Sequence, residues 1–218
     1  MCKICDHNDQ THSICRLLAH RGMASTAYEV AVPYALKTHQ QAAAAAAQVA
    51  LLSKQRCLLS ADLGAGGTVL LGHLVSCLRV PTLILVGTVA ESGCVAAAFR
   101  KMLPGAVVGE GDPEGAAAQE PEVCVMHAGC LSRLVRSKPT TPVFSRYRMV
   151  GMLHLPVTRK VVDLLTGLCP CPPYWVGVWT PCRVAGVDDV TLCGKAMCMD
   201  ASSVGSVSVR LCRPPLRG

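Results

Sequence analysis

The sequence predicts an α/β fold in which helices cover both faces of a mostly parallel sheet. Short apolar segments alternate along the chain with segments of helical composition. The apolar segments do not alternate polar with apolar residues, which is typical of strands that are buried on both faces. A glycine-rich turn at residues 64–68 follows one of these segments and precedes a helical one. This order of elements is the pattern of a sheet built from β–α units.

The individual elements follow from local composition. Six alanines at 42–47 predict a helix of about four turns that ends near Lys54, because alanine is the strongest helix former. The segment 109–121 is rich in Gly, Ala, Glu and Pro and is predicted to be a loop, whereas the valines of 204–211 alternate as in a closing strand. The other predicted strands are 57–61, 82–86, 107–108, 123–126, 149–153 and 174–178, and the other predicted helices are 69–78, 91–102, 131–135 and 158–165.

Composition limits the class of protein. The chain has 218 residues, of which 51% are hydrophobic and 16% charged, so it can build a core. Arg79 and Pro81 interrupt the apolar run that comes nearest to the length of a bilayer span, and the chain does not begin with a signal peptide. We therefore expect an intracellular protein of the cytoplasm or nucleus, not secreted and without a membrane partner. Most of its 14 cysteines are then reduced and act as small hydrophobic residues.

The glycine-rich turn follows the pattern of a phosphate-binding loop. The usual form is Gly-x-x-x-x-Gly-Lys-Ser/Thr, but Gly67 stands where the lysine belongs and Thr68 where the Mg²⁺-binding hydroxyl belongs. Backbone N–H groups of such a loop can still hold an anion, whereas the charge that contacts the β- and γ-phosphates is missing. We therefore expect residual binding of ATP or phosphate at most, and assign no cofactor. The candidate residues are Gly64, Ala65, Gly66, Gly67 and Thr68.

The net charge of +7 is unevenly distributed. No acidic residue lies between Glu122 and Asp163, a window rich in Lys and Arg. A basic face of this kind suits the phosphate backbone of a nucleic acid. A solvated basic surface is the alternative, since no aromatic platform for bases accompanies the charge. The candidate nucleic-acid contacts are Arg133, Arg136, Arg146 and Arg148.

A series of short segments between residues 36 and 183 stands in an order known from one protein family. The segments are 36–40, which contains Gln40, then 61–68, 81–88, 99–104, 126–133, 149–156 and 178–183. In this order they resemble motifs of the first RecA-like lobe of superfamily 2 helicases, the DEAD/DEAH-like kind found in large DNA viruses and in restriction or repair translocases. The glutamine motif that recognises adenine comes first, followed by the phosphate loop, the motif Ia strand and the helix end after it. The segment that touches the nucleic-acid backbone, the Asp-Glu-x-His strand and the Ser-Ala-Thr-Pro motif complete the series.

The resemblance implies a RecA-like P-loop NTPase fold for residues 27–218 and leaves 1–26 as a Cys- and His-rich extension. Within it, Gly151 replaces the Asp that holds Mg²⁺, Met152 replaces the Glu that activates water, and Trp179 occupies a small-residue position. The chain ends near the point at which the family's first lobe ends, so we expect no second lobe. Losing these charges removes most of what phosphoryl transfer needs, so no catalytic residue is assigned. The family residues that remain are Gln40, Thr68, His154, Thr180 and Pro181.

Cysteine and histidine also suggest two other kinds of site. Cys2, Cys5, His12 and Cys15 form a Cys₃His set that Zn²⁺ could bind. Their spacing matches no common zinc finger, so a flexible tail is the favoured alternative and zinc is not expected. A catalytic Cys–His pair is not assigned either, because 14 Cys and seven His make chance pairs numerous and no local context selects one.

Three interpretations of function remain open. The first is a helicase-like ATP-binding lobe with degraded catalytic motifs, a pseudoenzyme that binds nucleic acid or a partner such as an active helicase or transcription complex, in the setting of a virus-infected cell. The second is an ATP-dependent DNA/RNA helicase or ATPase subunit completed by another chain. The third is a decaying gene copy. A turnover assay on the pure protein separates the first two.

Overall fold

The computed structural model describes most of the predicted elements. The described residues are 30–54, 56–61, 64–111, 121–137, 146–154, 174–179 and 207–211. The predicted helix at 158–165 and the extension 1–26 lie outside these residues. Among the described residues, no helix combines the length and apolar character that a bilayer crossing requires.

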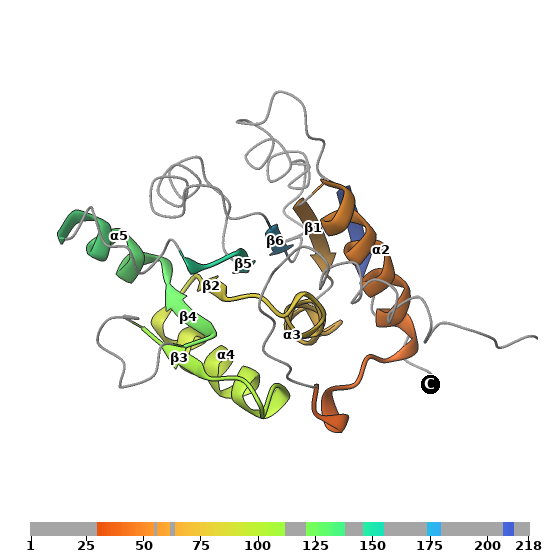
Figure 1. The fold of residues 1–218 in the computed structure, drawn as a ribbon, viewed down its shortest axis with the longest axis horizontal. Helices are drawn as coiled ribbons and strands as arrows, with labels where there is room; N and C mark the ends of the chain where they lie inside the picture. Colours follow the sequence, from red (N-terminus) through yellow and green to blue (C-terminus); the bar gives the residue numbers. More distant parts are fainter. Residues whose placement is uncertain are drawn as a thin grey trace, which may run out of the picture.

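Within the described residues, seven strands form one sheet in the order β3-β4-β2-β5-β6-β1-β7 (Figure 1). Each neighbouring pair is parallel, which confirms the predicted fold class. The three-residue strand β3 and the closing strand β7 occupy the two edges. The strands are β1 (Arg56–Ala61), β2 (Thr82–Val86), β3 (Val108–Glu110), β4 (Val123–His127), β5 (Met149–Leu153), β6 (Tyr174–Trp179) and β7 (Val207–Leu211).

The structure corrects the predicted loop at 109–121 at its beginning. Gly109 and Glu110 pair with Cys124 and Val125 of β4, so they extend β3 instead of starting the loop. Gly109 fits beside β4 because an added Cβ would lie 2.8 Å from the ring of Pro121. Residues 112–120 lie outside the described part of the chain.

Local capping explains where the helices begin. The helix α4 (Val89–Met102) starts two residues before its predicted start, because Thr88 and Glu91 form a capping box at its head. The helix α3 (Gly67–Leu78) also starts early, after Gly66 in the left-handed conformation. The predicted short turn at 131–135 is instead the ten-residue helix α5 (Ala128–Ser137), which begins directly after β4. A 3₁₀ turn η1 (Val32–Tyr34) precedes the alanine-rich helix α2 (Thr38–Lys54).

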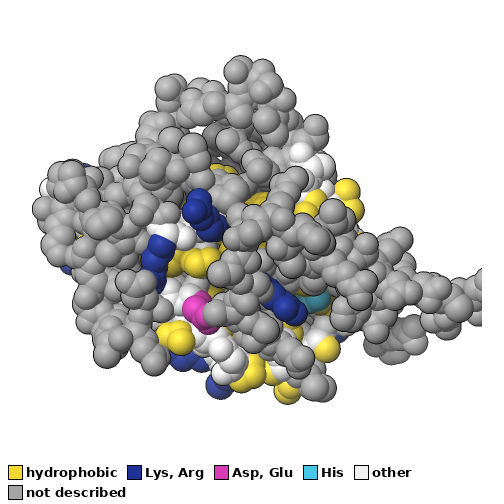
Figure 2. Space-filling model, in the orientation of Figure 1, with side chains coloured by type: hydrophobic (Ala, Val, Ile, Leu, Met, Phe, Trp, Pro, Cys, Tyr) yellow, Lys and Arg dark blue, Asp and Glu magenta, His cyan; other side chains and the backbone are white. Residues whose placement is uncertain are grey.

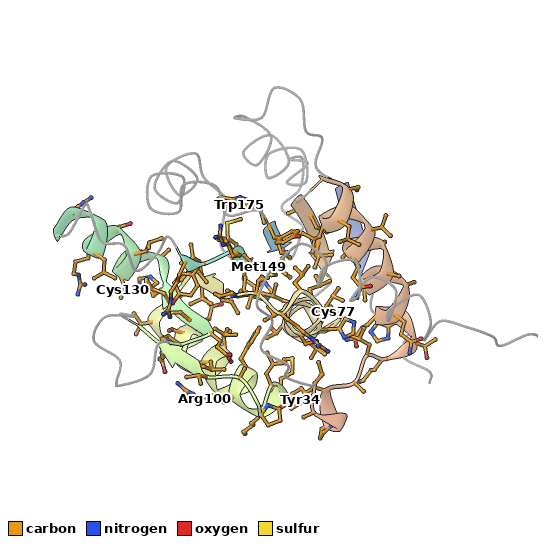
Figure 3. All side chains as sticks on the ribbon, in the orientation of Figure 1. Tyr34, Cys77, Arg100, Cys130, Met149 and Trp175 are labelled. Atoms are coloured by element: carbon orange, nitrogen blue, oxygen red, sulfur yellow. The ribbon has the colours of Figure 1, made fainter. Side chains whose placement is uncertain are left out.

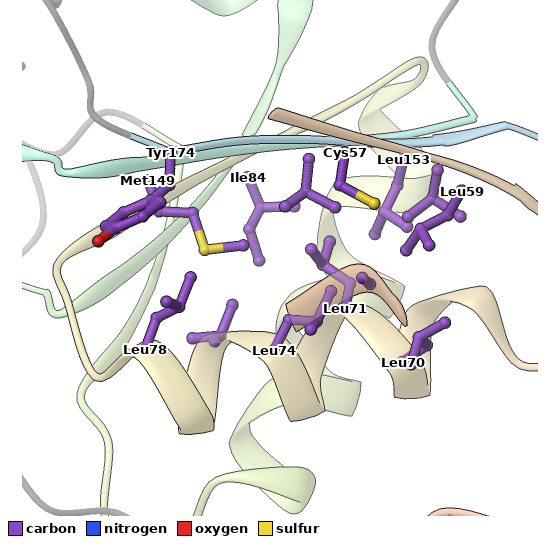
Figure 4. Packing of buried hydrophobic residues seen from close by; sticks show 14 of the residues in the cluster. Cys57, Leu59, Leu70, Leu71, Leu74, Leu78, Ile84, Met149, Leu153 and Tyr174 are labelled. Atoms are coloured by element: carbon purple, nitrogen blue, oxygen red, sulfur yellow. The ribbon is translucent and has the colours of Figure 1, made fainter. Parts of the chain in front are cut away.

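Both faces of the sheet are buried, as predicted. On one face α2, α3 and α4 share a core with alternate strand residues such as Leu59 and Ile84. Figure 4 shows α3 lying along this face with its leucines directed at the strands. Residues that point to the other face, such as Leu83, Leu85 and Val150, are also fully buried. Burying one such leucine contributes about 2 kcal/mol, so α3 is a main source of stability.

The connections place the candidate loop at the carboxyl edge of the sheet. The helix α3 leaves the end of β1, crosses β6 and β5, and feeds β2 on their far side. Carboxyl ends of parallel strands meet at one edge, where ligands of open α/β sheets bind. The glycine-rich turn, which follows β1, therefore lies at this edge beside the end of β6.

Candidate functional site

The glycine-rich turn folds tightly at the head of α3, as predicted. Gly64 and Gly66 have φ of 76° and 93°, values that side chains with a Cβ avoid. Gly66 is the N-cap, and its carbonyl accepts the Leu70 N–H at 3.0 Å. The N–H groups of the first helical turn have no carbonyl partner within the helix. They point the positive end of the helix dipole at the carboxyl edge, which suits an anion.

Gln40 of α2 forms a hydrogen bond to this turn. Its side chain is only 4% exposed. The Nε2 donates to the Ala65 carbonyl at 2.9 Å, and the Oε1 accepts from the Lys37 N–H at 2.9 Å. Both ends of the amide are therefore engaged with the backbone. The structure brings Gln40 to the loop, as the resemblance implies, but its role in recognising adenine remains a prediction.

The position at which the resemblance expects a lysine is filled by packing. Gly67 is buried, and a Cβ built on it would lie 2.6 Å from Cγ1 of Val178 and 3.4 Å from Cβ of Ala61. Contacts below about 3.0 Å overlap the van der Waals radii of two carbon atoms. Val178 on β6 is itself 2% exposed. The start of α3 thus rests directly on the sheet, with no space for a longer side chain.

The strand that resembles the Asp-Glu-x-His motif is apolar at both acidic positions. Gly151 faces α3, and an added Cβ would lie 3.1 Å and 3.3 Å from the two methyl groups of Leu71 and 3.6 Å from Cγ1 of Ile84. Met152 points to the opposite face of the sheet and is 1% exposed. His154 follows the strand with φ of 50°, and its N–H donates to the Val178 carbonyl at 2.9 Å. The retained histidine is thus exposed at the carboxyl edge.

The described residues offer few carboxylates for a metal ion. They contain Glu91, Glu110 and Glu122. Glu91 lies in the first turn of α4, where its Oε2 accepts from the N–H and the hydroxyl of Thr88 at 3.0 Å and 3.2 Å. In the described part of the chain no three His, Cys, Asp or Glu side chains gather as a metal would require. The predicted zinc ligands Cys2, Cys5, His12 and Cys15, and the motif residues Thr180 and Pro181, lie outside the described residues.

The structure separates the four candidate arginines. Arg133 and Arg136 are exposed on α5, which begins at the carboxyl edge. Arg148 is exposed at the amino edge, just before β5. Arg146 lies at this amino edge too, where its Nη2 donates to the Pro121 carbonyl at 2.6 Å. Its guanidinium carbon lies 5.0 Å from the centre of the Tyr147 ring. Arg146 therefore links the segment that precedes β5 to the segment that precedes β4.

The four candidate arginines therefore do not lie together on one basic face, contrary to the prediction from the sequence. In Figure 2 a few described Lys and Arg side chains are visible at several places, some of them next to hydrophobic side chains. Figure 1 shows α5 at the end of the sheet opposite α2, extending away from the strands. The guanidinium of Arg146 donates a hydrogen bond to the Pro121 carbonyl. Arg133 and Arg136 are exposed and are therefore the stronger candidates for contact with phosphate.

Sequence reasoning missed one polar cluster. His73 and Cys77 of α3 meet Gln48 of α2 (Figure 3). The spacing of four residues within a predicted helix places His73 and Cys77 on one helical face. Gln48 could not be found in this way, because only the packing of α2 on α3 brings it there.

No family model matches the sequence, and no curated protein matches it. Solved structures do share its fold. The UvsW helicase from bacteriophage T4 is 17% identical with a TM-score of 0.55, and the match covers 80% of this chain and 59% of that one. The SWI2/SNF2 ATPase core of Sulfolobus solfataricus, in complex with dsDNA, is 13% identical with a TM-score of 0.58, covering 80% and 37%.

A third similar structure is the Mycobacterium smegmatis helicase Lhr bound to ssDNA and AMP-PNP. It is 16% identical with a TM-score of 0.61, and the match covers 97% of this chain and 28% of that one. The chain therefore spans less than two thirds of each of these proteins. At such low identity the likeness shows the fold alone, which is RecA-like.

Proposed function

We propose that the chain is a helicase-like RecA lobe that binds nucleic acid and does not hydrolyse ATP. Packing at two positions where the resemblance expects charge supports this most strongly. Gly67 is buried against Val178, which leaves no room for a lysine side chain, and Gly151 is buried against the methyl groups of Leu71, which offer a carboxylate no polar partner. Phosphoryl transfer depends on positioned charge around the phosphates. At these two positions the chain has backbone and apolar side chains instead.

The intact turn supports a limited role for nucleotide. Backbone N–H groups at the start of a helix hold an anion without a lysine, and Thr68 is partly buried at this point. A nucleotide held in this way would stay intact, because the water and the metal have no carboxylate at Gly151 or Met152. The alternative of a shared ATPase requires a second chain to bring both a lysine and carboxylates to the carboxyl edge, because Gly67, Gly151 and Met152 provide none.

The nucleic-acid part of the proposal rests on α5. Two of the similar structures contain DNA. Arg133 and Arg136 are exposed on the helix that follows β4, within or next to the segment that resembles the family's backbone-contacting motif. Contacts to phosphates carry little sequence preference and weaken steeply as salt is added. We therefore propose non-specific, salt-sensitive binding of DNA or RNA through α5.

The double substitution Arg133→Glu and Arg136→Glu is expected to weaken nucleic-acid binding by about tenfold or more at low salt, because two phosphate contacts are lost and two repulsive charges are added. The slope of log affinity against log salt concentration should become shallower by the contribution of about two phosphate contacts. Fluorescence anisotropy with labelled single- and double-stranded oligonucleotides at several salt concentrations measures both quantities.

A matched control makes the same change of charge on another helix. Arg100→Glu with Lys101→Glu acts on the exposed last turn of α4, and this variant should bind nearly as well as the parent chain. The proposal fails if the parent does not bind at low salt, or if both double variants lose affinity equally.

A further inference from the structure

A small polar cluster lies where α2 and α3 pack together, beyond the glycine-rich turn. The Sγ of Cys77 lies 3.4 Å from the Nε2 of His73. The Nε2 of Gln48 donates to this Sγ at 3.2 Å and approaches the His73 Nε2 to 3.4 Å. Figure 3 labels Cys77 between the two helices. A thiol, an imidazole and an amide thus meet at one place, and the proposed function uses none of them.

The hydrogen-bonding groups determine the roles within this cluster. An amide nitrogen donates and does not accept, so with the Gln48 Nε2 in this place the contacts are satisfied by the His73 tautomer whose Nε2 presents its lone pair. The thiol is therefore the group that can pass a proton to His73. Burial lowers the pKa of His73, which keeps its ring neutral and the lone pair available at neutral pH. A base placed beside a thiol in this way activates it as a nucleophile.

We propose that Cys77 is a reactive thiol that forms mixed disulfides with small-molecule disulfides such as glutathione disulfide. The Sγ attacks one sulfur of the disulfide while its proton passes to the Nε2 of His73. The S–S bond breaks, and the second sulfur leaves with the bonding electron pair and takes up a proton. The products are a mixed disulfide at Cys77 and one small thiol. The Gln48 amide stabilises the negative charge that develops on the Sγ.

In the described part of the chain, no hydrogen bond to a histidine is recorded for Cys57, Cys94 or Cys124. Cys57 and Cys124 are buried, and burial raises the pKa of Cys57 to about 12. Cys94 on α4 is exposed, so a reagent reaches it more easily than it reaches the partly buried Cys77. The residues four positions before and after Cys94 are Ala90 and Ala98, so no histidine stands where His73 stands relative to Cys77. Cys94 is thus an internal reference for a thiol without a base.

Peptide-resolved mass spectrometry of the reduced, folded chain in limiting glutathione disulfide tests the proposal. Cys77 should be modified about tenfold faster than Cys94 despite its lower exposure, because a positioned base accelerates the step. His73→Gln should lower the Cys77 rate to about that of Cys94 and leave the Cys94 rate unchanged. Gln48→Leu should lower the Cys77 rate by a smaller factor.

The direction of the change separates a base from a structural support. A variant that merely loosened α2 from α3 would expose Cys77 and speed its modification. A slower Cys77 in His73→Gln therefore supports the proposal. Equal rates for Cys77 and Cys94 in the parent chain would overturn it, and so would a Cys77 rate that stays the same or rises in His73→Gln.

Discussion

Gly67→Lys is expected to destabilise the chain by about 2–4 kcal/mol and to produce no ATP turnover. The substitution restores the family's lysine, but its Cβ alone would approach Val178 Cγ1 to 2.6 Å. Val178 has a stiff β-branched side chain buried in the sheet, so it cannot rotate away without cost. The lysine would also extend past apolar side chains with no partner at Gly151. Chemical denaturation measures the free energy of unfolding.

A double-mutant cycle tests whether Val178 is the cause. Gly67→Ala alone should destabilise by about 1–3 kcal/mol, although alanine normally favours a helix. Val178→Ala alone should cost about 2 kcal/mol, because it leaves a cavity. The double variant should be more stable than the sum of the two effects predicts, by about 1 kcal/mol, since the smaller residue makes room for the added methyl. Strictly additive effects would show that Val178 does not exclude side chains from Gly67.

Gly151→Asp is expected to destabilise the chain by about 3–5 kcal/mol. The position is buried in β5, and the nearest atoms are methyl and methylene groups of Leu71 and Ile84. An ionised carboxylate in this place loses its hydration and gains no described partner. The expected cost is far larger than that of Gly151→Ala, for which Leu71 must move by only a few tenths of an ångström.

Gly151→Asn serves as the control, because it has nearly the same volume without the charge. Gly151→Asp should be clearly less stable than Gly151→Asn at about pH 7 and nearly equal to it at about pH 3, below the pKa of about 3.9 of an aspartate in the unfolded chain. Burial raises the pKa of a carboxylic acid, so the penalty is present when the unfolded chain is ionised and disappears as both states become protonated. Equal stability of the two variants at both pH values would indicate a solvated or paired carboxylate, and a site less apolar than described.

The fold could be predicted largely from local patterns. The apolar segments at 82–86 and 149–153 are strands with those bounds, because strands buried on both faces are nearly continuous apolar runs. The helix starts predicted from the sequence are less accurate, because α3, α4 and α5 each begin earlier than predicted. The start of α4 depends on the Thr88–Glu91 capping box, a signal present in the sequence, whereas the full length of α5 depends on its direct continuation from β4.

The candidate site could be predicted in part. Glycine spacing identified the turn, since its positive φ values require glycine at 64 and 66. Its surroundings depend on tertiary packing that no local pattern contains. Val178 lies about a hundred residues beyond Gly67 along the chain, and β6 brings them together only through the strand order. The same holds for Arg146, whose charge suggested phosphate contact but whose guanidinium bonds to Pro121.

ATP turnover by the pure, full chain tests the central claim most directly. Phosphate release would be measured with Mg²⁺, with and without single- and double-stranded DNA and RNA, beside the Thr68→Ala variant. We predict no release above background under any of these conditions, and no difference between the parent chain and the variant. Mg²⁺-dependent release by the parent chain that Thr68→Ala abolishes would contradict the claim, because it would show that the glycine-rich turn supports catalysis without its lysine.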